Sequence, residues 1–244
     1  MLSSYLSGSF RLKTDQIFEG LTAAGSELLL GSGVTHLYRK GEIIFREGGI
    51  PTGIYHIKSG KVKKYKLTPK GREQIIYLCS DGELLGYHAV LAEEHYPDTT
   101  AALTNSEITF FPRESFLQAL SQSPELSNRL LKALAHEFSL FINTFTNLAT
   151  KTVRERLAFN LLLLEEKFRL ADAPIEAVDI HLSRTDLANM IGTAKETLVR
   201  LLKDFKQKKL IQTTSASIRI LNREGIITEA NLMGQQPAAA PKNK

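Results

Sequence analysis

The sequence predicts an α+β fold with an N-terminal antiparallel β-roll of the jelly-roll type, a long central helix and a C-terminal winged helix-turn-helix. Three observations predict it. Short strand-like segments separated by glycine-bearing turns fill residues 34–112, a long segment of helical apolar periodicity follows Pro124, and two short helical segments flank Gly192. Hydrophobic residues make up 43% of the 244 residues, which is ample for packed cores.

Changes of pattern along the chain divide it into four parts. We expect the β-roll, a sensor domain that begins with a short helical lead-in, over residues 1–122, the central dimerisation helix over 123–150, and the winged-helix domain over 151–234. The last ten residues, 235–244, are rich in proline and alanine, and we expect them to be disordered.

The β-roll is predicted from six short strands of typical composition. They cover residues 34–39, 42–45, 53–58, 61–67, 73–78 and 107–112. Lysines between Lys61 and Lys66 alternate with Val62 and Tyr65, a pattern that favours an exposed strand face over a nucleic-acid patch. The one cysteine, Cys79, cannot form an intrachain disulfide and is interpreted as a small buried hydrophobic residue.

The central helix begins at Ser123-Pro124, where proline suits the first helical position. Apolar residues then recur at spacings of three and four, as in a coiled-coil seam. The residues of this stripe are Leu131, Leu134, Phe138, Phe141, Phe145 and Leu148. The stripe could pack on the chain's own roll, but its length and regularity favour a homodimer with two-fold symmetry.

The helix-turn-helix prediction depends on the segment from Ser183 to Phe205. Ala188 is small enough for two helices to approach, Gly192 permits the positive φ of the turn, and Leu198 joins the second helix to the first. Each helix also begins with a capping-box pattern. Ser183 is followed by Asp186, and Thr193 is followed by Glu196.

The second helix, predicted over Thr193–Phe205, has two different faces. Its apolar face comprises Ala194, Leu198, Leu201, Leu202 and Phe205, and its outward face comprises Glu196, Val199, Arg200 and Lys203. An arginine can donate to guanine O6 and N7, and a glutamate can accept from cytosine N4, so this face can read a G·C pair. In an ordinary surface helix, Arg200 would instead pair with Glu196 or Asp204.

Further features support contact with a nucleic acid. Thr193 and Thr197 lie near the helix N-terminus, where phosphate oxygens bind, and Lys203 can contact another phosphate. Residues 210–213 and 217–221 form a predicted hairpin, or wing, after which Asn222 can cap a last helix. Residues 1–150 hold 15 basic and 15 acidic residues, whereas residues 151–244 hold 16 and 11. The net charge of +5 therefore comes entirely from the C-terminal part, as expected of a polyanion binder.

Other classes of protein are less well supported. No segment has the long unbroken apolar run of a membrane span or signal peptide, so we expect a soluble, cytoplasmic protein without membrane contact. The six histidines never occur as H-x-H, and no P-loop, nucleophile elbow or zinc motif is present, so we expect neither a metal site nor an enzyme of the cupin or any other type. The alternative that this chain is a regulatory module that docks to protein instead of DNA stays open, although it would not explain the basic C-terminal part.

The order of roll, long helix and winged helix resembles the CRP/FNR regulators, which include the cyclic AMP receptor protein. The residues that carry this resemblance are Gly41-Glu42-x-Ile44-Phe45, Gly60-x-Val62, Gly71-Arg72, Gly82-Glu83-x-x-Gly86 and the segment GTAKETLVRLLKDF from Gly192. The resemblance implies a homodimeric transcription regulator that binds double-stranded DNA and RNA polymerase. It also implies an effector pocket between the roll and the central helix.

The resemblance assigns roles to individual residues. Glu196 and Arg200 match base-reading positions, and Lys195 and Val199 complete that set. Ser183, Arg184 and Thr197 match positions that contact backbone phosphate. The expected effector pocket comprises Gly86, Tyr87, His88, Thr99, Thr100, Phe141 and Ile142.

The pocket departs from the nucleotide-binding pattern of the family. Tyr87 follows Gly86 where nucleotide-binding members have glutamate, and no arginine lies between Arg72 and Arg113 to hold a phosphate. We therefore predict that cyclic AMP is not the effector. The N-terminal cysteines of iron–sulfur relatives are absent, so an iron–sulfur cluster is not expected. A haem cofactor stays open, because one histidine, such as His88 or His95, can serve as its axial ligand. An unknown small-molecule effector also stays open.

Overall fold

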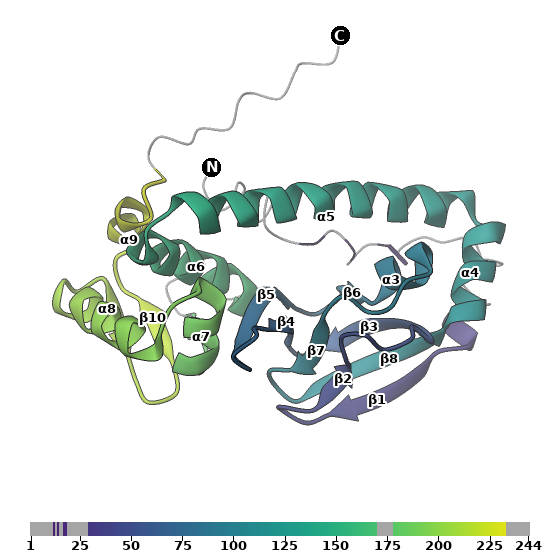
Figure 1. The fold of residues 1–244 in the computed structure, drawn as a ribbon, viewed down its shortest axis with the longest axis horizontal. Coiled ribbons are helices and arrows are strands. Elements are labelled where there is room, and N and C mark those ends of the chain that lie inside the picture. Colours follow the sequence, from purple (N-terminus) through teal and green to yellow (C-terminus); the bar gives the residue numbers. More distant parts are fainter. Residues whose placement is uncertain (1–11, 13, 15–16, 19–28, 170–177, 233–244) are drawn as a thin grey trace, which may run out of the picture. The chain divides into compact units, whose positions relative to one another are not determined.

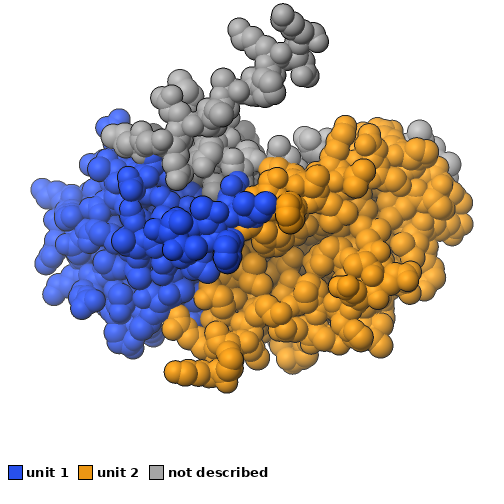
Figure 2. Space-filling view, turned by 45° about the horizontal axis from the view of Figure 1, so that its top comes forward, with its two compact units in different colours: residues 1–11, 142–244 blue, residues 12–141 orange. Residues whose placement is uncertain are grey.

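A computed structural model describes residues 12, 14, 17–18, 29–169 and 178–232 (Figure 1). Most of the predicted helical lead-in and the whole predicted tail lie outside these residues. The chain divides into two compact units (Figure 2). We call residues 12–141 the roll unit, and residues 142–244 with 1–11 the C-terminal unit.

The roll unit contains two four-stranded antiparallel sheets, as the sequence predicts. One sheet has the order β1 (Val34–Tyr38), β8 (Ser106–Pro112), β3 (Gly53–Ser59) and β6 (Leu84–Leu85). The other has the order β2 (Ile43–Phe45), β7 (Thr99–Ala102), β4 (Val62–Leu67) and β5 (Glu73–Cys79). The sequence analysis missed β6 and β7. The first has only two residues, and the second, TTAA, is buried at every position and so shows no alternation.

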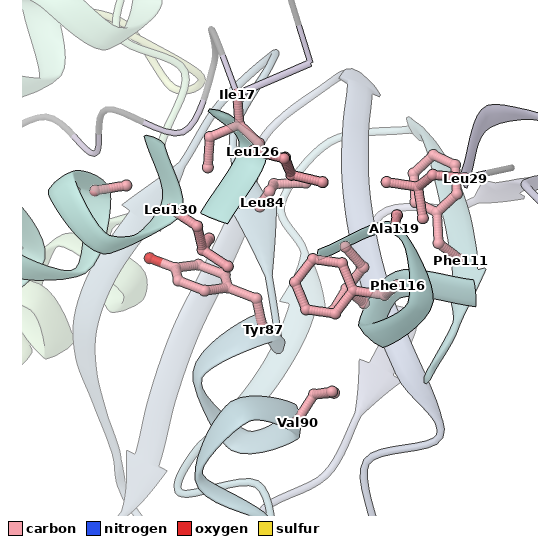
Figure 3. Close-up of a cluster of buried hydrophobic side chains, with 12 residues drawn as sticks. Ile17, Leu29, Leu84, Tyr87, Val90, Phe111, Phe116, Ala119, Leu126 and Leu130 are labelled. Atoms are coloured by element: carbon pink, nitrogen blue, oxygen red, sulfur yellow. The ribbon is translucent and has the colours of Figure 1, made fainter. Parts of the chain in front are cut away.

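Among the described residues, the helices that accompany the sheets of the roll unit include α3 (Tyr87–Ala92), which was not predicted, α4 (Arg113–Gln122) and the first part of α5 (Pro124–Thr150). Gly86 begins α3 in the left-handed region, with φ of 77°, a conformation that glycine adopts without strain. Within this unit α3 lies between α5 and the sheets (Figure 1). Tyr87 and Val90 of α3 share a buried cluster with Leu126 and Leu130 of α5, which joins the central helix to the roll (Figure 3).

The C-terminal unit is a winged helix-turn-helix, as predicted. Its elements are α6 (Val153–Phe168), α7 (Arg184–Ile191), α8 (Lys195–Gln207), β9 (Ile211–Thr213), β10 (Ile218–Ile220) and α9 (Arg223–Glu229). β9 and β10 pair as an antiparallel hairpin, the wing. Thr152 and Glu155 form a complete capping box at the start of α6, and the Asn222 side chain accepts from the Gly225 N–H at the start of α9. None of the helices in the described part of the chain is long and apolar enough to cross a membrane.

Candidate nucleic-acid interface and effector pocket

The turn between α7 and α8 has the geometry that the sequence predicts. Ser183 is the N-cap of α7, and its hydroxyl accepts from the Asp186 N–H at 2.9 Å. Gly192 ends α7 with φ of 67°, and Leu198 of α8 is fully buried against the unit's core. These contacts fix the orientation of α8 relative to α7, so the outward face of α8 has a defined position next to the turn.

The predicted start of α8 was wrong. The helix begins at Lys195, and its N-cap is Ala194, which makes no side-chain capping bond. The Thr193 N–H donates to the carbonyl of Ala188 at 3.0 Å, so Thr193 still belongs to the end of α7. Ala194 is exposed rather than part of the apolar face, because the N-cap lies outside the helical repeat.

The outward face of α8 is exposed as predicted. Glu196, Val199, Arg200 and Lys203 all point away from the core, and Lys195 is exposed beside them at the helix start, while Thr197 is half-buried. Among the described residues, Arg200 forms no ion pair with Glu196 or Asp204. Asp204 instead accepts from Arg154 of α6. The side chains of α8 that are predicted to read bases are therefore not occupied by these ion pairs.

Arg154 holds α8 from behind, a role that the sequence analysis missed. Its Nε lies 2.5 Å from Glu229 of α9, and its guanidinium stacks on Phe205 of α8 at 5.0 Å from the ring centroid. The hydrogen bonds with Glu229 raise the pKa of Arg154 and lower that of Glu229. Partners this far apart in the chain leave no local sequence signal.

Arg156 joins the end of α5 to the helix-turn-helix. Its guanidinium donates to the carbonyl of Ile191 at the end of α7 and to the carbonyl of Lys151 just after α5, each at 2.8 Å. A cation at two helix C-termini is favourable because it satisfies carbonyls that have no intrahelical partner. The position of the turn is thus tied to the end of the central helix.

Arg184, a predicted phosphate contact, lies at the turn of the wing, between β9 and β10. Its guanidinium donates to the carbonyls of Thr214 at 3.0 Å and Ser217 at 3.3 Å. Burial lowers its pKa. In this structure Arg184 therefore joins the start of α7 to the wing.

The predicted dimer stripe lies on the outer face of α5. Leu131, Phe138 and Phe145 are 66%, 68% and 72% exposed, and Leu148 is 44% exposed. Leu134 and Phe141 are only half-buried. The opposite face packs inside the chain through Leu126, Leu130, Ala133, Glu137 and Leu140. α5 is thus apolar on two faces, of which the described residues cover one.

Most of the predicted effector pocket is buried and lies in the roll unit. Gly86, Tyr87, Thr99 and Thr100 are buried, whereas His88 is half-buried. Phe141 packs against the core of the roll, and Ile142 is half exposed, so these two do not join the polar part of the site. The groups that face the polar part from elsewhere are Lys64, Asp98 and Glu137.

Lys64 corrects the prediction that its strand presents lysines to solvent. Lys64 is 3% exposed, and its Nζ lies 3.5 Å from Asp98 and 3.8 Å from Glu137, which are each 5% exposed. Tyr87 donates a hydrogen bond to Glu137, and Thr100 donates to Asp98 at 3.2 Å. We call these five side chains the Lys64 cluster. The prediction failed because β4 is covered on the side where Lys64 lies.

The pKa values within this region follow from burial and charge. Burial alone would lower the pKa of the Lys64 ammonium, but Asp98 and Glu137 more than offset it and raise that pKa. Burial and the neighbouring Glu137 raise the pKa of Tyr87. Burial, with a contribution from Lys64, lowers the pKa of His88 to about 3. At neutral pH, Lys64 is charged and His88 is neutral.

Comparison with known proteins now identifies the two units. The family of the cyclic nucleotide-binding domain matches residues 35–123, and that of the Crp-like helix-turn-helix domain matches residues 155–227. The chain belongs to the CRP/FNR family of transcription regulators. It is therefore a DNA-binding regulator, as the resemblance implied.

Individual members of the family match most of the chain. The transcriptional activator protein Anr of Pseudomonas protegens is 29% identical over 184 residues, which are 75% of this chain and 75% of Anr. The fumarate and nitrate reduction regulatory protein of Escherichia coli is 27% identical over 77% of this chain and 75% of its own. The solved structure of a CRP/FNR-family regulator from Eubacterium rectale has the same fold. Its TM-score is 0.72 at 22% identity, over 88% of this chain and 97% of that one.

The cyclic nucleotide that the first family implies does not fit the residues of this roll. A buried phosphate needs a cationic or multi-donor partner. Lys64 is the buried cation of the site, and two buried carboxylates already neutralise it. A cyclic phosphate placed beside it would also face Asp98 and Glu137, whose charges repel it.

Proposed function

We propose that this CRP/FNR regulator binds DNA as a homodimer and reads a pseudo-palindromic site through two copies of α8. The observation that carries the proposal is the outward face of α8, where Arg200 and Glu196 are exposed and form no ion pair with each other. In each half-site Arg200 donates to a guanine and Glu196 accepts from the paired cytosine. Lys195 and Val199 contact neighbouring bases.

The phosphate contacts surround this base-reading face. Ser183, Arg184, Thr193, Thr197 and Lys203 are proposed to contact the backbone. Arg184 can do so only beside the turn of the wing, where it already bonds to the wing carbonyls. We further propose that the bound dimer contacts RNA polymerase, that it acts in the cytoplasm, and that it has no catalytic role. We also propose that cyclic AMP is not its effector. The DNA reading proposed here requires no haem on His88 or His95.

Dimerisation is proposed through the exposed stripe of α5. Two copies that pair along Leu131, Phe138 and Phe145 would bury these side chains with heptad spacing and give the two-fold symmetry that paired half-sites require. Sedimentation tests this contact. Phe138→Glu should sediment as a monomer, whereas Ser139→Glu, next to it on α5 but outside the stripe, should stay a dimer. A dimer of unchanged stability in Phe138→Glu would contradict the proposed interface.

Selection of bound DNA from a pool of random duplexes tests the function as a whole. We expect an enriched inverted repeat whose half-sites each contain a G·C pair, with centres about one helical turn apart. Arg200→Ala should lose the preference for that pair. A pool without any enriched sequence would contradict the proposed DNA reading. Repetition with a cell extract, and calorimetric titration with cyclic AMP, test for an effector.

A further inference from the structure

The Lys64 cluster brings together four elements of the roll unit. Lys64 comes from β4, Tyr87 from α3, Thr100 from β7 with Asp98 just before that strand, and Glu137 from the middle of α5. The nitrogen of Lys64 lies within 4 Å of both carboxylates, and each carboxylate accepts a hydroxyl hydrogen bond as well. All of its charges are therefore paired and hydrogen-bonded inside the protein.

Glu137 is unusual among the buried residues of α5. The others on its inward face are Leu126, Leu130, Ala133 and Leu140, which pack without directional contacts. A buried carboxylate that is both ion-paired and hydrogen-bonded accepts only one arrangement of its partners. Glu137 therefore fixes where α5 lies on the roll, and Phe138, the next residue, lies on the exposed stripe.

We propose that the Lys64 cluster stands in place of an anionic effector, so that the carboxylate of Glu137 takes the position next to the buried cation and the regulator binds its DNA site without a nucleotide. The proposal rests on the proposed function. Its basis is the mismatch described above. Within the described residues, the cation of the site is already paired with two carboxylates, and one of these, Glu137, already joins the central helix to the roll.

The first experiment removes any bound small molecule. The full chain is unfolded in guanidinium chloride, dialysed and refolded, and its affinity for the selected duplex is compared with that of the untreated protein. We expect the two dissociation constants to agree within about two-fold, less than the ten-fold that 1.4 kcal/mol represents. Added cyclic AMP should change neither value. Loss of DNA binding after refolding, with recovery on addition of cyclic AMP or of a deproteinised cell extract, would overturn the proposal.

The second experiment weakens the cluster from the side of α5. Glu137→Gln keeps the size of the side chain but removes its charge, and it should raise the dissociation constant of the DNA site about ten-fold, with no recovery on addition of cyclic AMP. Tyr87→Phe, which removes one hydroxyl and no charge, should also raise this dissociation constant, but by a smaller factor. The control is Glu125→Gln, an exposed residue of α5 paired with Arg129, which should leave the affinity unchanged.

These outcomes separate the inference from the proposed function. If untreated protein enriches no duplex, the proposed DNA reading fails, and calorimetric titration with cyclic AMP still tests the cluster. No binding is expected, and micromolar binding of cyclic AMP would overturn the inference. If untreated protein binds and Glu137→Gln binds equally well while folded by circular dichroism, the cluster does not position α5 and the inference is wrong.

Discussion

The two cationic regions of this regulator are in opposite states. On α8, Lys195, Arg200 and Lys203 are exposed, and none forms an ion pair within the described residues. In the roll, Lys64 is buried and lies between two carboxylates. An exposed cation can exchange its counterions for DNA phosphates, whereas a buried, paired cation cannot accept an anion without losing a partner. The cations of α8 are thus exposed to solvent in one unit, whereas Lys64 makes internal contacts in the other.

The largest effect should come from removing the buried cation. Lys64→Met leaves Asp98 and Glu137 buried together without a counter-charge, which should lower the free energy of unfolding by about 3–5 kcal/mol in a urea titration. The control is Lys66→Met on the same strand, whose partner Glu47 lies 2.9 Å away at the surface. Exposed pairs of that kind contribute only about 0–1 kcal/mol. Equal losses of unfolding free energy in the two variants would show that the buried and the exposed lysine contribute equally to stability.

The next effect concerns the exposed cation that is proposed to read a base. Arg200→Ala should weaken binding to the selected duplex by about 1–3 kcal/mol and relax the preference at the G·C pair. Binding is measured on duplexes with each of the four base pairs at that position. Because Arg200 is exposed, the melting temperature of the variant should stay at the wild-type value. A variant that keeps the same order of preference would show that another side chain reads this pair.

The features that the sequence could predict are those that depend on residues close together in the chain. Pro124, Ser183 and Asn222 act on residues within one turn, and the helices that they start were predicted with their correct first turns. Gly192 and the exposed side of α8 were likewise predictable. The predicted capping by Thr193 failed because the turn extends α7 through a bond to Ala188, an effect that two neighbouring helices decide together.

Lys64 shows what a local pattern cannot reveal. The run from Lys61 to Lys66, in which Val62 and Tyr65 interrupt the lysines, was interpreted as a strand with a polar face, and its lysines were assigned to solvent. Its partners are Asp98, just before β7, and Glu137 of α5, both far along the chain, so only the folded roll brings them together. The ion pairs of Arg154 and the carbonyl contacts of Arg156 were missed for the same reason.

A smaller effect should appear in the partly exposed ion pairs of the C-terminal unit. Hydrogen bonding from Arg154 lowers the pKa of Glu229 below its ordinary value. A carboxyl whose pKa is lower in the folded state stabilises the fold at pH values above its unfolded pKa of about 4.3, and this contribution is lost as the pH falls through the folded value. Glu229→Gln should therefore melt at a lower temperature near neutrality and lose less stability on acidification. If the melting temperatures of the wild type and of Glu229→Gln changed with pH in parallel, the ion pair of Glu229 with Arg154 would not be the source of this pH dependence.

The smallest effect should come from the proposed phosphate contact on α8. Lys203→Ala should weaken binding to every duplex alike, and the plot of log affinity against log salt concentration should become shallower by about one unit, because one fewer counterion is released. Lys132→Ala, which removes an exposed lysine from α5, serves as the control and should leave the slope unchanged. Since Lys203 reads no base in this interpretation, the order of preference among duplexes should be that of the wild type. A change in that order would assign Lys203 to base reading and move the boundary between the two kinds of contact on α8.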